Sequence, residues 1–106
     1  MTSQTSWRLE TMEQLRDSVH RRMCELNELE PGAFPQTERL LEKRGQACGV
    51  FFCLHGPRSV KLTAIWETSQ NRILFYSSTG QRQEAALLET APELPVSLEA
   101  SGRQAA

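Results

Sequence analysis

The chain lacks the features typical of a membrane protein, a secreted protein or a common enzyme. No apolar run approaches the roughly 20 residues that a membrane-spanning helix needs. Residues 1–6 show no charged region followed by an apolar stretch, so we expect no secretory signal and a cytoplasmic location. The sequence also contains no Gly-x-x-x-x-Gly-Lys, Gly-x-Gly-x-x-Gly, Gly-x-Ser-x-Gly or His-Glu-x-x-His motif.

Side chains suited to catalysis or metal binding are few in this chain. Asp17 is the single aspartate, and there are two histidines and three cysteines. Neither the cysteines nor the histidines are spaced like the close ligand pairs of a zinc site. An odd number of cysteines without a secretory signal indicates reduced thiols. We therefore expect no enzymatic activity, no metal and no cofactor.

Length and charge indicate one small soluble domain. The chain has 106 residues, with 12 basic and 13 acidic side chains and a formal net charge of −1. This balance argues against a histone-like protein that binds anionic surfaces with its whole body. We expect a single small α+β domain over residues 1–90. Prolines and a glycine interrupt the remainder, so residues 91–106 are expected to form a flexible C-terminal tail.

A long amphipathic helix is predicted over Trp7–Leu29. Apolar residues recur there every three or four positions, which places them on one helical face. These residues are Leu9, Met12, Leu15, Val19, Met23, Leu26 and Leu29. Ser6 is one candidate N-cap, and the pattern Thr11-x-x-Gln14 offers a capping box if the helix begins later. Pro31 ends the helix because proline disfavours helical geometry in the residue before it.

A second, shorter helix is predicted over Pro35–Arg44. Proline is favoured at the first helical position, and Gly45 suits the left-handed conformation that follows a helix. Leu40 and Leu41 provide the apolar contact of this helix with the rest of the domain.

Three strands are predicted next, because the apolar period changes from 3.6 to 2. They cover Cys48–Leu54, Val60–Glu67 and Arg72–Ser77, and short turns join them into an antiparallel meander. Helix-forming residues over Gln81–Thr90 predict a short C-terminal helix. The expected fold is α+β, with a long N-terminal helix and a short second helix packed on a three-stranded antiparallel meander.

One face of this meander is expected to lack a covering helix. The strands carry apolar residues on both faces, and Ile65 shares the uncovered face with either Leu74 and Tyr76 or Ile73 and Phe75. A large exposed apolar patch marks an interaction site. A second helix, a homodimer or a bound protein would cover it. Since two-fold dimers dominate soluble oligomers, our leading hypothesis is a non-enzymatic protein-interaction or regulatory module that acts as a homodimer.

The alternative hypothesis is a nucleic-acid-binding domain that binds RNA. From Cys48 to Arg82 the chain has four basic residues against one acidic residue, Glu67. Basic residues interleaved with aromatic side chains are typical of single-stranded nucleic-acid binding on a sheet. The candidate binding surface consists of Arg58, Lys61, Trp66, Arg72, Tyr76 and Arg82. The structural interpretation of the same residues is an aromatic core with solubilising basic groups.

Two smaller features allow a structural or a chemical interpretation. Cys53 and His55 suit a nucleophile and its base, but residues at this spacing lie about 6–7 Å apart along a strand. We therefore favour a buried thiol beside a histidine in the turn. The cluster His20-Arg21-Arg22 is expected on the solvated side of the first helix, where acidic neighbours neutralise it.

Overall fold

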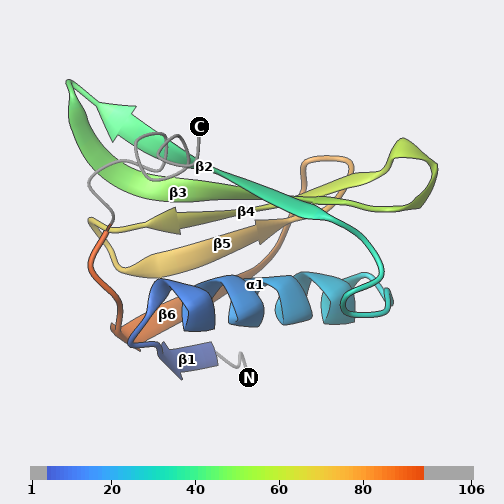
Figure 1. Ribbon diagram of the computed structural model, residues 1–106, viewed down its shortest axis with the longest axis horizontal. Coiled ribbons are helices and arrows are strands. Elements are labelled where there is room, and N and C mark those ends of the chain that lie inside the picture. The colour runs from blue at the N-terminus through green and yellow to red at the C-terminus, as the bar shows by residue number, and fades with distance from the viewer. Residues whose placement is uncertain (1–4, 95–106) are drawn as a thin grey trace.

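The computed structural model describes residues 5–94, in which one helix packs on a six-stranded mixed sheet (Figure 1). Along the chain the elements are β1 (Thr5–Arg8), α1 (Met12–Leu26), β2 (Gln36–Lys43), β3 (Gln46–His55), β4 (Lys61–Glu67), β5 (Arg72–Tyr76) and β6 (Arg82–Thr90). The strand order is β1-β6-β5-β4-β3-β2, antiparallel except for the parallel pair β1 and β6. The class α+β is retained, but the expected arrangement of elements is wrong.

The N-terminal helix is shorter than predicted, because a strand takes its first turn. Residues 5–8 form β1 and pair with β6, and α1 begins only at Met12. The later of the two candidate caps is confirmed: Thr11 Oγ1 accepts a hydrogen bond from the backbone N–H of Gln14 at 3.1 Å. The helix ends at Leu26, three residues before the predicted end.

The predicted second helix is a strand, β2. Its backbone pairs along its whole length with β3, to which Arg44 and Gly45 connect it in a tight hairpin turn. Both turn residues have positive φ, 54° and 79°, as the two-residue hairpin turn of type I′ requires. Gly45 was correctly expected to be left-handed, but this conformation serves a hairpin and not a helix end. Pairing with β3 outweighs the weak helix propensity of the segment.

The predicted C-terminal helix is also a strand, β6, which lies between β5 and β1. Ala86 and Leu88 alternate into the core, so the segment buries apolar side chains with a period of two. Of the predicted flexible tail, Ala91 and Leu94 pack against the core, and residues 95–106 lie outside the described residues.

The three predicted strands are present as β3, β4 and β5, with no end shifted by more than two residues. They form an antiparallel meander, but they are the middle of a six-stranded sheet and not the whole sheet. The meander prediction is therefore wrong in extent, because β2 and β6 add a neighbour on each side.

The core lies between α1 and one face of the sheet. The helix contributes Leu15, Val19, Met23 and Cys24, all at most 1% exposed. The largest fully buried side chains of the sheet are Trp66, Phe52 and Phe75. Among the described residues no polar side chain is buried without a hydrogen-bond partner.

On one face of the sheet, ion pairs and hydrogen bonds attach α1 to β2 at one flank and to β6 near the other. Arg16 Nε lies 2.8 Å from a carboxylate oxygen of Glu38 on β2, and Arg22 Nε lies 2.7 Å from one of Glu84 on β6. His20 Nε2 accepts a hydrogen bond from the backbone N–H of Gly32 at 2.9 Å, which ties α1 to the loop before β2. These contacts fix the helix over the core face and leave the opposite face without it.

Gly49 is required where β3 bends next to β4. A Cβ atom at this position would lie 2.2 Å from the backbone carbonyl oxygen of Trp66, too close for any side chain. The bend coincides with a register shift in the pairing of β2 and β3 between Leu41 and Glu42. In Figure 1 this end of the β2–β3 hairpin curves away from the other strands.

We predict that Gly49→Ala destabilises the protein by about 1–3 kcal/mol, the usual cost of forcing extra atoms into a packed site. Gly56→Ala is the matched control, because its Cβ would meet no atom closer than 3.4 Å and its φ of −81° suits alanine. Urea unfolding followed by circular dichroism measures both changes. Equal stability of the two variants would contradict the close approach at Gly49.

Candidate interaction surface on the open sheet face

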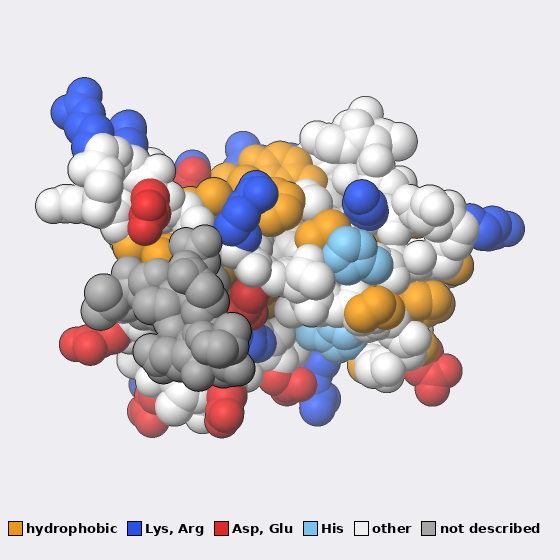
Figure 2. Space-filling view, turned by 45° about the horizontal axis from the view of Figure 1, so that its top comes forward, with side chains coloured by type: hydrophobic (Ala, Val, Ile, Leu, Met, Phe, Trp, Pro, Cys, Tyr) orange, Lys and Arg blue, Asp and Glu red, His pale blue; other side chains and the backbone are white. Residues whose placement is uncertain are grey.

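The sheet face opposite α1 carries a row of apolar side chains that crosses the strands. Consecutive pairs in the strand register join Phe51 to Ile65, Ile65 to Leu74, and Leu74 to Ala85. We call these four residues the apolar row. No helix of the described chain covers them, because α1 lies on the other face. Figure 2 looks obliquely onto this side and shows hydrophobic side chains among basic ones.

The residues of the open face differ in how much surface they offer. Leu74 is only 5% exposed because its neighbours in the sheet shield it, whereas Phe51 and Ile65 are half-buried. Leu87 on β6 is 37% exposed and is the one large hydrophobic side chain among the described residues that counts as exposed. The guanidinium carbon of Arg39 lies 5.2 Å from the centre of the Phe51 ring, a cation–π contact.

The rows of side chains on either side of the apolar row differ in chemistry. On one side lies the Glu67 row, which consists of Leu41, Gly49, Glu67, Arg72 and Leu87. Its charges cancel, since Arg72 Nε lies 2.8 Å from a carboxylate oxygen of Glu67. On the other side lies the Tyr76 row, which consists of Thr37, Cys53, Thr63, Tyr76 and Arg82. The pair His55 and Lys61 lies beyond it, so this end of the face is basic.

The structure brings together three of the six residues predicted to form a binding surface. Lys61, Tyr76 and Arg82 lie at the basic end of the open face, and Arg58 stands in the adjoining turn. Arg72 lies at the opposite end in its ion pair. Trp66 is 1% exposed in the core, where its indole N–H points to Asn71 at 3.5 Å, so it offers no surface.

Sequence reasoning missed four contributors to this face: Arg39, Phe51, Ala85 and Leu87. Phe51 belongs to a continuous apolar run in which alternation cannot tell the two faces apart. The other three lie in segments that were predicted as helices. The choice between two sets beside Ile65 is settled in favour of Leu74 and Tyr76, since Ile73 and Phe75 are fully buried on the core face.

The edge of the sheet is a poor alternative binding site. β2 forms one edge of the described sheet, and its charged residues include Glu38, Arg39, Glu42 and Lys43. Charged edge strands disfavour the addition of a further strand from another chain. Its bulge between Leu41 and Glu42 disrupts the ladder as well. The face is therefore better suited to binding than this edge.

The cysteine–histidine pair has no catalytic geometry. Cys53 is 8% exposed, and the structure shows no hydrogen bond between it and His55 within the described residues. His55 Nε2 is instead 2.9 Å from Thr37 Oγ1 across the β2–β3 pair. The buried-thiol interpretation thus accounts for these residues.

The basic cluster on α1 is largely neutralised. Arg21 Nε lies 2.9 Å from a carboxylate oxygen of Asp17, and Arg22 pairs with both Glu25 and Glu84. These hydrogen-bonded carboxylates, Glu84 foremost, raise the pKa of Arg22 above its ordinary value. A free anion therefore has few unpaired charges to meet on this side of the helix.

Other kinds of site find little support in the described part of the chain. Its His, Cys, Asp and Glu residues form no group of three placed to hold a metal ion. None of the helices described has the length and apolarity to cross a bilayer. Comparison with models of protein families, with curated proteins and with solved structures gave no match.

We predict that iodoacetamide alkylates Cys48 in the folded protein and leaves Cys24 and Cys53 unmodified until the protein unfolds. Cys48 is partly exposed, whereas Cys24 is 1% exposed and burial raises the pKa of its thiol. Mass spectrometry after timed labelling, with and without denaturant, measures each site. Labelling of Cys53 as fast as Cys48 would show an accessible, activated thiol and contradict this interpretation.

Proposed function

We propose that the protein is a non-enzymatic protein-interaction module that forms a homodimer through the open sheet face. The observation that carries this proposal is the apolar row, which no described helix covers. Fully burying one large apolar side chain is worth roughly 1.5–3 kcal/mol. A second layer over the half-buried Phe51, Ile65 and the exposed Leu87 would gain part of that amount at each residue.

The composition of the face fits an interface between proteins. Interfaces combine an apolar centre with a polar, solvent-accessible rim, and aromatic residues and arginine are enriched in them. Here the apolar row forms the centre, and the Glu67 row and the Tyr76 row form the rim. Arg39 over the Phe51 ring provides an aromatic–arginine contact on this face.

A second copy of the chain fits this face when the two-fold axis lies along the apolar row. Rotation about that axis stacks the two apolar rows and places the Tyr76 row of one copy over the Glu67 row of the other. The strand register then places Tyr76 of one copy over Arg72 of the other and Arg82 over Leu87, while Arg39, at the β2 end of the row, faces its counterpart. Two sheets stacked face to face in this way have the geometry of a β-sandwich.

We predict that Ile65→Glu and Tyr76→Glu each weaken the dimer at least tenfold, which is about 1.4 kcal/mol or more. Ile65→Glu buries a carboxylate without a partner at the apolar centre. Tyr76→Glu removes an aromatic contact from the rim. Gln70→Glu is the matched control, because it adds the same charge in the exposed β4–β5 turn. Analytical ultracentrifugation over a range of concentrations gives the dissociation constants.

Two outcomes would overturn the homodimer. One is a wild-type protein that remains monomeric at high micromolar concentration. The other is a dimer whose dissociation constant is the same in the two face variants and in Gln70→Glu. Circular dichroism of every variant separates loss of assembly from loss of fold.

A second candidate function, binding of single-stranded RNA, is favoured by a specific observation. Two aromatic side chains, Phe51 and Tyr76, lie on the open face with Arg39, Lys61 and Arg82 around them. Bases stack on such aromatic platforms while basic side chains contact the phosphates. The proposal ranks second because Trp66 is buried and Arg72 is paired, which removes two of the expected contacts.

If RNA is the ligand, we predict that Lys61→Gln lowers the slope of log affinity against log salt by about 1, since each phosphate contact contributes roughly one unit. Fluorescence anisotropy of a labelled single-stranded oligonucleotide, measured over a salt series, gives this slope. Lys43→Gln, at the end of β2 next to the hairpin turn and far from Lys61 along the strands, is the control. No binding at low salt would exclude the RNA hypothesis.

A further inference from the structure

A cavity lies at one end of the sheet, between the turn that joins β3 to β4 and the turn that joins β5 to β6. Its volume is about 730 Å³. It is lined by His55, Gly56, Ser59, Val60, Lys61 and Ser78. The cavity is widely open to solvent, and Ser59 and Lys61 on its wall are exposed. Four of the six lining side chains, one from β4, one from β3 and one from each turn, can donate a hydrogen bond.

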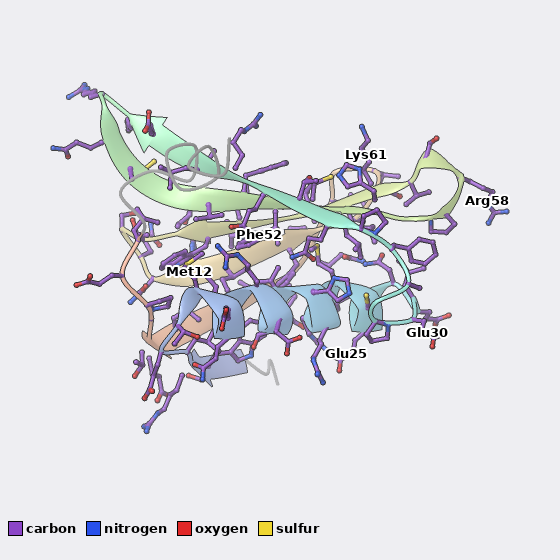
Figure 3. The ribbon with its side chains drawn as sticks, viewed as in Figure 1. Met12, Glu25, Glu30, Phe52, Arg58 and Lys61 are labelled. Carbon is purple, nitrogen blue, oxygen red and sulfur yellow. The ribbon has the colours of Figure 1, made fainter. Side chains whose placement is uncertain are left out.

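The charge around this cavity is of one sign. No carboxylate lines it, and Lys61 forms no ion pair with any described residue. Arg58, next to the lining residue Ser59, is likewise without an ion pair in the described chain. In Figure 3 Lys61 projects upward from the strands, whereas Arg58 projects outward from the tip of the β3–β4 turn. A negatively charged group entering the cavity would meet the ammonium of Lys61, which no described carboxylate neutralises.

The turn that builds the cavity has a strained backbone. Arg58 and Ser59 both adopt left-handed φ angles, 56° and 63°, although neither is glycine. Each such residue costs of order 1 kcal/mol or more, and strain of this kind is concentrated at binding sites. The turn is held by two backbone hydrogen bonds, from Gly56 N–H to Val60 and from Val60 N–H to Pro57. This turn conformation brings Ser59 to the wall of the cavity, which Lys61 also lines.

We propose that this cavity is a binding site for a phosphoryl group. The cavity is lined by an ammonium, two hydroxyls and the imidazole of His55, whose Nε2 already bonds to Thr37 Oγ1. Several donors from different elements suit a tetrahedral group with three or more acceptor oxygens. A carboxylate, with two oxygens in one plane, would use fewer of these donors.

The other cavities of the described chain lack this combination. The cavity between β1 and α1, about 530 Å³, is lined by arginines that already hold carboxylates: Arg8 pairs with Glu89 and Arg21 with Asp17. The cavity at the β2–β3 turn contains Lys43 and Arg44 but no hydroxyl side chain. The phosphoryl site is independent of the proposed homodimer, because it requires only residues of one chain.

The test uses the two lysines of the chain, Lys43 and Lys61, as each other's control. Both are exposed and neither has an ion pair among the described residues. The folded full-length protein is acetylated with a limiting amine reagent at constant ionic strength, and mass spectrometry follows each lysine separately. Pyrophosphate at about ten times its dissociation constant is expected to slow acetylation of Lys61 about tenfold and to leave Lys43 unchanged.

Different ligands distinguish the source of the phosphoryl group. Inorganic phosphate, pyrophosphate and a nucleoside triphosphate are compared with acetate and sodium chloride. Protection of Lys61 by any of the three phosphoryl compounds, at concentrations where acetate has no effect, supports the proposal. The order of protection among the three compounds shows whether the groups attached to the phosphoryl group add to binding. Equal protection of both lysines, or protection by acetate at the same concentration, overturns it. Stronger protection by a single-stranded oligonucleotide than by pyrophosphate overturns it in favour of nucleic-acid binding.

Ser59→Gly provides a second test that does not depend on removing a charge. Glycine relieves the left-handed strain, so the fold is retained, while the hydroxyl is lost. Isothermal titration with pyrophosphate is expected to show several-fold weaker binding for Ser59→Gly and for Lys61→Gln than for the wild type and Lys43→Gln. Unchanged binding in both cavity variants would overturn the assignment of the site.

Discussion

The packing of α1 on a single face of the sheet is the constraint on which the rest of the structure depends. The helix buries its apolar stripe against Phe52 and Trp66, and ion pairs from Arg16 and Arg22 hold it in place. Because the described residues contain one helix and six strands, the helix can cover only one side. The exposed character of the other side therefore follows from the number of elements and not from any particular residue on it.

The sheet also separates charge between its two faces. The carboxylates that point toward the helix are occupied by its arginines, as with Glu38 and Glu84. On the outward side the strands carry Arg39, Lys61, Arg72 and Arg82 against Glu67 and Glu89. Each of these two carboxylates pairs with an arginine. A chain with almost no net charge thus presents a basic surface on its open side. Such a local field affects the choice of partner more than the total charge does.

Local patterns in the sequence identified the elements whose burial is periodic and missed those that depend on a neighbour. β4 and the core of α1 were recognised because their apolar residues repeat with a clear period, and β3 because its apolar run is continuous and of strand length. β2 and β6 contain glutamate, leucine and alanine, which favour a helix in isolation. Each pairs instead with a neighbouring strand, β3 or β5, whose backbone N–H and C=O groups would otherwise lack partners on that side. The open face was anticipated through Ile65, while Leu87 was lost with the mistaken helix.

The pairing of β1 with β6 sets the order in which the domain can be completed during synthesis. Thr5 lies beside Ala86, so two neighbours in the sheet are made about 80 residues apart. At translation rates of 5–20 residues per second, the first strand waits roughly 4–16 s for its partner. The helix and the meander can form in that interval, but the edge of β5 and the backbone of β1 stay unpaired until β6 is made. A nascent chain is most vulnerable to pairing with a foreign strand during this wait.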